Sequence, residues 1–297
     1  MKQIKNDTKP STSMLMKGQS IYTGDEYREI TRISQQNKIL NRIASGYLDD
    51  LFSFYENPTV LDIGCADGTN ILERLKGRQY HSLIGIDRNE KKIETAQKRI
   101  KAKNTTFLCC DICTNNLDRT LSDYLSHIGK DGFDIIHISS VLLHIDHPDF
   151  FLKRIRTYLS EQGRLFIQDE DDGLNSVYPY EESFDDCFYV WEHSIEAGDR
   201  FMGGKIPFFL ENGGYSDIKV LSTSATSVDF NGEMKDCLWD MYFNSDLWVA
   251  NDVSFYDKTD AYDRFLSYQE KHSALREAYM NKRYFVMLGI FFIVASK

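Results

Sequence analysis

The sequence predicts an α/β protein built on a doubly wound, mostly parallel sheet. Short apolar segments alternate with helical segments between residues 59 and 168, and the connections are short. Strands that alternate with helices of this length pair in parallel, so helices are expected on both faces of the sheet. The longest apolar run, residues 286–295, falls well short of the roughly 20 residues that a membrane helix needs, so no membrane segment is expected.

Seven strands are expected, each an apolar run with turn residues nearby. They are Val60–Ile63, Leu83–Ile86, Thr106–Cys109, Phe133–Ile138, Arg164–Gln168, Ile218–Ser222 and Phe285–Ala295. The helices expected between them are Thr69–Leu75, Glu90–Lys101, Pro148–Leu159 and Lys205–Glu211. This order gives a Rossmann-like arrangement.

The chain is expected to form one domain, residues 25–297, with added segments. Residues 1–24 are polar and are predicted to be disordered or loosely attached. Residues 25–55 carry apolar positions at helical intervals, which predicts an N-terminal cap of one or two helices. Residues 169–204 and 228–281 are insertions rich in aromatic residues, and we expect them to form a lid over a substrate.

Charge and cysteine content narrow the function. The net charge of -10 argues against nucleic acid as the principal partner, because such binding needs clustered Lys and Arg. Six cysteines without a secretory signal favour free thiols in a reducing cytoplasm. The pair Cys110 and Cys113 has zinc-ligand spacing but no second pair, so no metal site is predicted. A monomer or homodimer is expected.

The stretch VLDIGCADGTN, residues 60–70, places Asp62, Gly64 and Gly68 where the first strand turns into the first helix. In a doubly wound sheet this is where ligands bind, and glycine lets the backbone approach them closely. Asp87 closes the second strand, nineteen residues after Gly68, where an acid can accept hydrogen bonds from both ribose hydroxyls. Asp111 closes the third strand, beside the expected adenine. The combination predicts a cofactor that carries a nucleoside.

The turn disfavours a dinucleotide. The pattern Gly-x-Gly-x-x-Gly would need glycine at 66 and 69, where the chain has Ala66 and Thr69. No Gly-Lys-Ser/Thr motif of a phosphate-binding loop is present either. An NAD-dependent oxidoreductase therefore remains only an alternative, together with a non-catalytic scaffold or sensor that retains the cofactor site.

Five motifs in order carry a family resemblance: VLDIGCADG, IGID, CCDIC, FDIIHISSVLLHI and GRLFIQDED. The series resembles that of class I S-adenosylmethionine-dependent methyltransferases of the bacterial small-molecule type, with Ala66 in place of the middle glycine of the first motif. The upstream RISQQNKIL resembles an Arg-Leu-x-x-Gln helix of a bacterial branch of that family. The resemblance implies methyl transfer from S-adenosyl-L-methionine to O, N, S or C of a small or medium-sized metabolite, leaving S-adenosyl-L-homocysteine.

The resemblance also implies roles for particular residues. The methionine part of the cofactor would lie near Asp62, Gly64, Cys65 and Gly68. The ribose would bind Asp87, and the adenine Asp111 and Ile112, while Ser139 and Ser140 would form the far wall. Arg32 and Gln36 would close over the cofactor, with Arg32 pairing with its carboxylate, and the expected set also includes Tyr27 and Arg88.

Candidates for a catalytic base are His144, Asp171 and His193, and a base is needed only if the acceptor arrives protonated. Asp169 to Asp172 also suggest magnesium, but a solvated or capping role is the preferred interpretation. Between Asp169 and Arg200 eleven acids accompany one Arg and six aromatic residues, namely Tyr178, Tyr180, Phe184, Phe188, Tyr189 and Trp191. This composition suits a cationic or amine-bearing acceptor, or else a plain amphipathic helix that packs its aromatic residues on the core.

Overall fold

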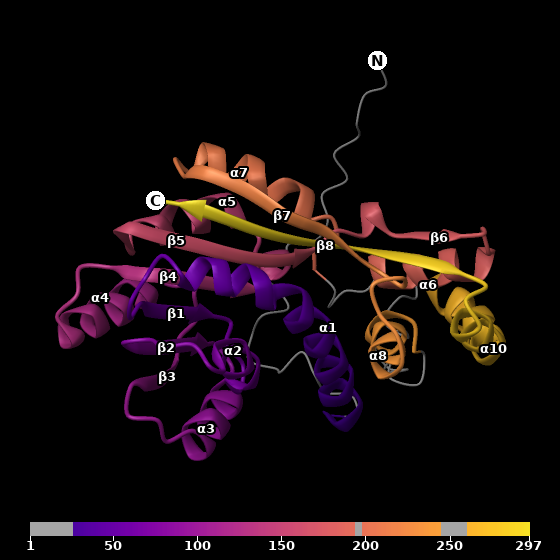
Figure 1. Cartoon of the computed structure of the whole chain (residues 1–297), viewed down its shortest axis with the longest axis horizontal. Coiled ribbons are helices and arrows are strands. Elements are labelled where there is room, and N and C mark those ends of the chain that lie inside the picture. The colour runs from indigo at the N-terminus through magenta and orange to yellow at the C-terminus, as the bar shows by residue number, and fades with distance from the viewer. Residues whose placement is uncertain (1–25, 194–197, 245–259) are drawn as a thin grey trace.

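A computed structural model describes residues 26–193, 198–244 and 260–297 (Figure 1). The predicted loose segment, residues 1–24, lies outside the described residues. The described strands form one sheet, and helices lie on both of its faces, as the sequence predicts.

The sheet is mostly parallel. Its strands are β1 (Thr59–Ile63), β2 (Ser82–Asp87), β3 (Thr105–Cys109), β4 (Phe133–Ser139), β5 (Leu159–Glu170), β6 (Ser176–Tyr178), β7 (Ser216–Thr226) and β8 (Phe285–Ser296). The order is β3-β2-β1-β4-β5-β8-β6, with β7 pairing with β8. Strands β1 to β5 pair in parallel, whereas β8 is antiparallel to its neighbours β5, β6 and β7. The carboxyl ends of β1, β2 and β4 therefore meet at one edge of the sheet.

The prediction of seven strands was wrong by one, because the sheet of the described chain has eight. The additional strand is β6, whose three residues pair with Phe285–Met287 at the start of β8. β5 pairs with the other end of β8, so β5 and β6 follow the same edge of that long strand. Between them the chain leaves the ladder at Asp171, whose N–H still donates to Gly289 O at 3.0 Å. Asp169 to Asp172 therefore span the end of β5 and the break, and all four residues are buried.

The helices divide between the two faces. They are α1 (Glu26–Phe52), α2 (Thr69–Leu75), α3 (Glu90–Arg99), α4 (Asn116–Ile128), α5 (Pro148–Arg156), α6 (Glu182–Glu192), α7 (Ile206–Asn212), α8 (Glu233–Tyr242) and α10 (Ala261–Met280). Buried side chains of α4, α5 and α7 form one core cluster with the sheet, and those of α1, α2, α3, α6, α8 and α10 form the other. No helix was expected over residues 116–128, where α4 lies.

The cap is one continuous helix, α1, which crosses the lower part of the sheet in Figure 1. The first insertion contains the end of β5, β6 and α6, and the second contributes α8 and α10, while residues 245–259 lie outside the described part. Figure 1 shows α6, α8 and α10 gathered at the end of the molecule where β8 begins. α1 meets this group through α8, where Cys237 Sγ lies 2.9 Å from Gln35 Oε1.

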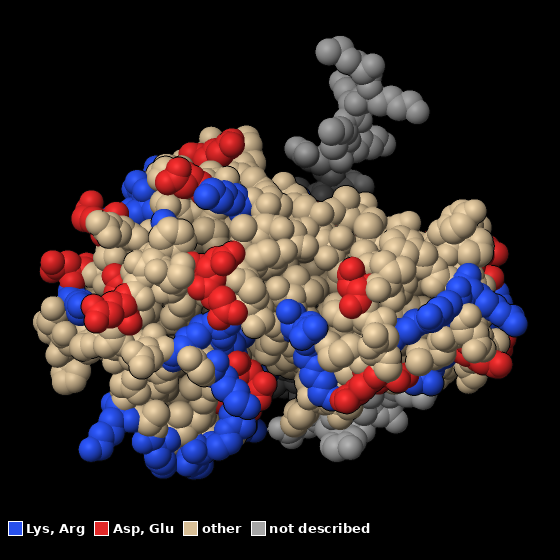
Figure 2. Space-filling view, in the orientation of Figure 1, with Lys and Arg blue, Asp and Glu red and all other residues tan. Residues whose placement is uncertain are grey.

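The surface combines an acidic total with a basic region. Figure 2 shows Lys and Arg gathered at the lower left, where Figure 1 places α3. α3 itself carries four basic residues, Lys91, Lys92, Lys98 and Arg99, against two acids. Among the described helices, none is both long and apolar enough to cross a bilayer.

Candidate cofactor and acceptor site

The turn after β1 is a tight left-handed bend. Gly64 and Gly68 have φ of 74° and 75°, and Ala66 between them has φ of 49°. The N–H groups of Gly64 and Cys65 both donate to Ile86 O, which fixes the bend against the end of β2. Cys65 is buried, and burial raises the pKa of its thiol, so it remains protonated. A small residue at a turn, as the sequence suggests, fits this environment.

Gly64 cannot be replaced without disturbance. A Cβ at this position would stand 2.3 Å from Val141 Cγ2, and the positive φ would strain any other side chain. We expect Gly64→Ala to lower the free energy of unfolding by about 1–3 kcal/mol. Gly46→Ala is the control, since Gly46 lies in α1 with no atom within 4 Å of its added Cβ, and it is expected to raise stability by about 0.5–1 kcal/mol. Urea unfolding measures both, and equal stabilities for Gly64→Ala and wild type would contradict the strain.

Asp87 stands beside the bend. Its Oδ2 accepts from Ala66 N at 2.9 Å, and its Oδ1 accepts from Asn89 N at 2.8 Å. The carboxylate therefore holds the glycine bend and the start of α3 together, a contact that the sequence did not indicate. Each carboxylate oxygen has a second lone pair, so both can still accept from hydroxyl groups. The acceptors that a ribose requires are present at this edge.

Asp62 lies below the bend in a buried network. Its Oδ1 is 2.6 Å from His137 Nδ1, and His137 Nε2 is 2.6 Å from Arg74 Nη1. Because a guanidinium only donates, Nε2 of His137 accepts and its Nδ1–H donates to Asp62. Burial lowers the pKa of His137, in agreement with a neutral ring between the two charges. Asp62 is thus bound to the core, a role that the sequence did not predict.

The residues after β4 connect the sheet to α1. Ser139 Oγ donates to Gln168 Oε1 at 2.6 Å, and Ser140 Oγ donates to Glu170 Oε1 at 2.9 Å. Ser140 has φ of 51°, a strained value that favours glycine. Gln36 Nε2 donates to the same Glu170 oxygen at 3.3 Å, and Arg32 Nη1 donates to Gln36 Oε1 at 2.8 Å. The predicted residues of α1 and of β4 therefore meet at Glu170.

Asp111 and Ile112, which the resemblance assigns to the adenine, follow β3, and Arg88, a further predicted cofactor residue, follows β2. Asp111 is exposed, and its Oδ1 accepts from Cys113 N at 2.9 Å. Ile112 is half-buried and Arg88 is exposed. Tyr27 lies in the first turn of α1, and its side chain is outside the described residues. The structure brings Asp87 to the bend and Arg32, Gln36 and Ser140 to Glu170.

A small pocket lies next to Glu170. Its cavity has a volume of about 20 Å³, room for one water-sized group. The lining comes from α1, the end of β5, α6, α8 and β8 and from the segment before α7; its residues are Arg32, Gln36, Glu170, Trp191, Arg200, Met241, Tyr242, Leu288, Gly289 and Ile290. The cap and both insertions thus contribute side chains to one pocket.

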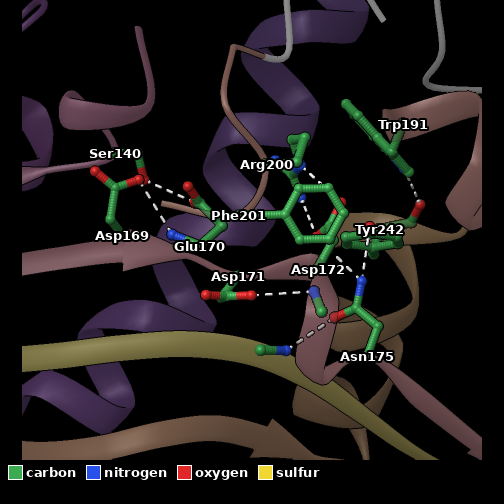
Figure 3. A network of polar contacts seen from close by, with 12 residues as sticks. Ser140, Asp169, Glu170, Asp171, Asp172, Asn175, Trp191, Arg200, Phe201 and Tyr242 are labelled. Atoms are coloured by element: carbon green, nitrogen blue, oxygen red, sulfur yellow. Dashed lines mark hydrogen bonds and ion pairs between the residues drawn. The ribbon is translucent and has the colours of Figure 1, made fainter. Parts of the chain in front are cut away.

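The four consecutive acids at the end of β5 are buried, so of the expected solvated or capping roles the solvated one is wrong, whereas Asp171 does cap the turn that follows β5. Figure 3 shows how their partners surround them. Asp172 binds Arg200 through two hydrogen bonds of 2.8 Å, one to each carboxylate oxygen. The Arg200 guanidinium in turn lies over the Trp191 and Tyr242 rings, with Cζ 5.4 and 5.6 Å from their centroids. No group of three or more His, Cys, Asp or Glu in the described ranges is arranged to hold a metal ion.

Asp171 was predicted as a base, but the structure gives it a capping role. Its Oδ1 accepts from Gly173 N at 3.1 Å, and its Oδ2 accepts from Gly204 N at 2.6 Å. Both oxygens therefore bind backbone N–H groups that hold the segment after β5, and the residue does not line the pocket. His193, at the end of α6, is also absent from the lining; its ring stacks on Tyr189 at 3.8 Å, and its Nδ1 donates to Tyr189 O. Neither residue is placed as a base at this pocket.

His144 follows β4 and keeps exposed surface, although protein surrounds much of it. Loss of water and the positive charges of Arg200, Arg88 and Arg32 lower its pKa to about 4, while Glu170 opposes the shift. Since the unfolded chain binds the proton more readily, the contribution of this ring to stability falls as pH drops from about 6.5 to 4. We expect its ring signals in an NMR titration to shift with a midpoint near pH 4. A midpoint near 6.5 would contradict the placement.

Comparison with known proteins identifies the family. A model of the methyltransferase domain matches residues 55–216, more than half of the chain. The chain belongs to this family, the class I S-adenosylmethionine-dependent methyltransferases. S-adenosylmethionine is the cofactor of this class, as the motif series implies.

Particular relatives match parts of the chain. The ubiquinone biosynthesis O-methyltransferase of Pelagibacter ubique (strain HTCC1062) is 31% identical over 121 residues, 41% of this chain and 45% of that protein. The pavine N-methyltransferase of Thalictrum flavum subsp. glaucum is 21% identical over 195 residues, which are 64% of this chain and 52% of that protein. The chain spans about half the length of the curated relatives that it matches.

Among solved structures, the phosphoethanolamine N-methyltransferase 2 of Haemonchus contortus, in complex with S-adenosyl-L-methionine, aligns with a TM-score of 0.49 and 19% identity. The alignment covers 88% of this chain and 52% of that one.

Proposed function

We propose that the protein transfers the methyl group of S-adenosylmethionine to a small or medium-sized metabolite by in-line displacement. The observation that carries the proposal is the left-handed bend of Gly64 to Gly68 held against the carboxylate of Asp87. The glycines permit a left-handed backbone that a side chain would strain, and Asp87 retains lone pairs for two ribose hydroxyls. The bound cofactor supplies an electrophilic methyl group on a sulfonium.

The residues beside the bend have complementary roles in this proposal. Asp111 and Ile112, with Arg88, form the adenine side, and Ser139 and Ser140 the far wall. Arg32 and Gln36 close over the cofactor, and Tyr27 completes the set. Asp62 acts from below, because its bond to His137 fixes the end of β1 under the bend.

The same proposal assigns the cap and the two insertions to a lid over the acceptor. Its support is the pocket next to Glu170, which α1, α6 and α8 line together. Such a lid would align the acceptor and exclude water, effects worth up to about 7–11 kcal/mol in well-oriented reactions. The chain itself provides alignment, and His144, which follows β4 and is exposed, is the candidate base if the acceptor arrives protonated.

The experiment that tests the function is incubation of the protein with methyl-labelled S-adenosylmethionine and fractionated cell extract. Label is expected to appear in a low-molecular-weight fraction, and Asp87→Ala is expected to abolish most of that transfer. Transfer to nucleic acid or protein alone would contradict a metabolite acceptor. Binding of the cofactor without transfer to any fraction would favour the non-catalytic scaffold or sensor.

A further inference from the structure

The carboxylate of Glu170 has one oxygen without a partner. The residue is 6% exposed, and its Oε1 accepts from Ser140 and Gln36. Its Oε2 is buried and has no hydrogen-bond partner in the structure. A buried polar atom that lacks a partner destabilises the fold, more so when it is charged, so native proteins rarely leave one without a partner. Because Glu170 lines the pocket, its Oε2 can accept a hydrogen bond from a ligand that enters there.

Asp169 is buried directly beside Glu170. Asp169 Oδ2 accepts from Leu142 N at 3.0 Å, and its Oδ1 accepts from Glu170 N at 3.1 Å. Burial and the nearby charge of Glu170 raise the pKa of Asp169 well above its ordinary value. Two buried carboxylates this close repel each other, which favours the protonated form of Asp169.

Of the charged side chains that line the pocket, Glu170 is the one that we assign to a ligand, through its Oε2. Arg200 is held by both oxygens of Asp172, and its guanidinium lies over Trp191 and Tyr242. Arg32 also lies over Trp191, with Cζ 5.5 Å from the ring centroid. The aromatic rings therefore already contact cations of the chain itself. Of the six aromatic residues considered for a cationic acceptor, Trp191 lines this pocket, and its ring already contacts Arg32 and Arg200. The carboxylate oxygen without a donor is therefore the group that we assign to a cationic ligand.

Given the proposed methyl transfer, we infer that the acceptor is an amine and that Glu170 is its specificity residue, with Oε2 binding the ammonium group in the pocket. The pocket's volume of about 20 Å³ matches one such group. A charge-assisted hydrogen bond from an ammonium is roughly twice as strong as one between neutral groups, which favours an amine over a hydroxyl of the same shape. Glu170 also touches Ser140 and Gln36, so the ammonium would lie beside the wall assigned to the cofactor.

The test uses the full chain saturated with S-adenosylhomocysteine, titrated calorimetrically with benzylamine and with benzyl alcohol, which have the same shape but differ in charge. Benzylamine is expected to bind at least about tenfold more tightly than benzyl alcohol. Glu170→Gln retains the Oε1 acceptor and removes the charge, and it is expected to abolish this preference. Glu211→Gln changes an exposed glutamate on α7 and should preserve it.

The outcomes separate this inference from the proposed function. Equal binding of the two probes, binding of neither, or an unchanged preference in Glu170→Gln would overturn the role of Glu170. Tighter binding of benzoate than of benzylamine would also overturn it and would assign the pocket to Arg32 and Arg200. The affinity for S-adenosylhomocysteine is measured first, in wild type and in Glu170→Gln. If wild type fails to bind it, the proposed function fails together with the inference.

Discussion

Replacement of Asp172 by alanine is expected to lower the free energy of unfolding by about 3–5 kcal/mol. Asp172 is buried and holds Arg200 through two hydrogen bonds of 2.8 Å, while its N–H donates to Arg200 O. Without the carboxylate, a buried guanidinium remains without its counter-charge between Trp191 and Tyr242. Urea unfolding at pH 7 measures the loss.

A matched control compares the stability lost when a buried ion pair is broken with the stability lost when an exposed ion pair is broken. Glu94 and Lys98 form an exposed pair within α3 at 3.0 Å, and Glu94→Ala is expected to cost less than about 0.5 kcal/mol. Replacing both buried partners, as in Asp172→Leu with Arg200→Met, should cost less than Asp172→Ala alone, because no unpaired charge then remains. Equal losses for Asp172→Ala and Glu94→Ala would show that the buried pair has no special weight.

Replacement of Asp87 by alanine is expected to weaken binding of S-adenosylhomocysteine by about 1.5–3 kcal/mol, or roughly 10- to 150-fold. The variant removes the acceptors for the ribose and also the bonds to Ala66 N and Asn89 N that hold the bend. Asp87→Asn keeps one oxygen acceptor and should lose less. Calorimetry gives the affinities, and circular dichroism confirms that each variant folds.

The control for Asp87 lies three residues further on. Glu90 is exposed in the first turn of α3, and Glu90→Ala changes the charge of the region by the same amount. It should leave the affinity within about twofold, since long-range effects of exposed charges are screened. If Asp87→Ala binds as tightly as Glu90→Ala, the assignment of Asp87 to the ribose is wrong.

The fold was predictable where the signal is local. The bend at Gly64 and Gly68 follows from residue types that favour left-handed backbone, and β1, β2 and β4 are short, mostly apolar segments. α4 also had a local signal that the analysis missed, because Leu117, Leu121 and Leu125 recur every four residues. The strand β6 had no local signal. Its three residues pair with the start of β8 because β5, which precedes them, already runs along the rest of β8.

The acidic segment shows why the acceptor site was less predictable. In the sequence, Asp169 to Asp172 are four consecutive acids, which normally lie in water. Their burial depends on partners far along the chain: Leu142 N for Asp169, Gly204 N for Asp171 and Arg200 for Asp172. Glu170 was not predicted as a site residue, because what distinguishes it is the oxygen that these contacts leave without a partner.

We propose above all that the bend beside Asp87 binds the adenosine of S-adenosylmethionine. The most direct test of this proposal is separate calorimetric titration of the full chain with S-adenosylhomocysteine and with NADH. The proposal predicts saturable binding of S-adenosylhomocysteine at one site per chain and no binding of NADH. Binding of NADH without binding of S-adenosylhomocysteine would contradict it.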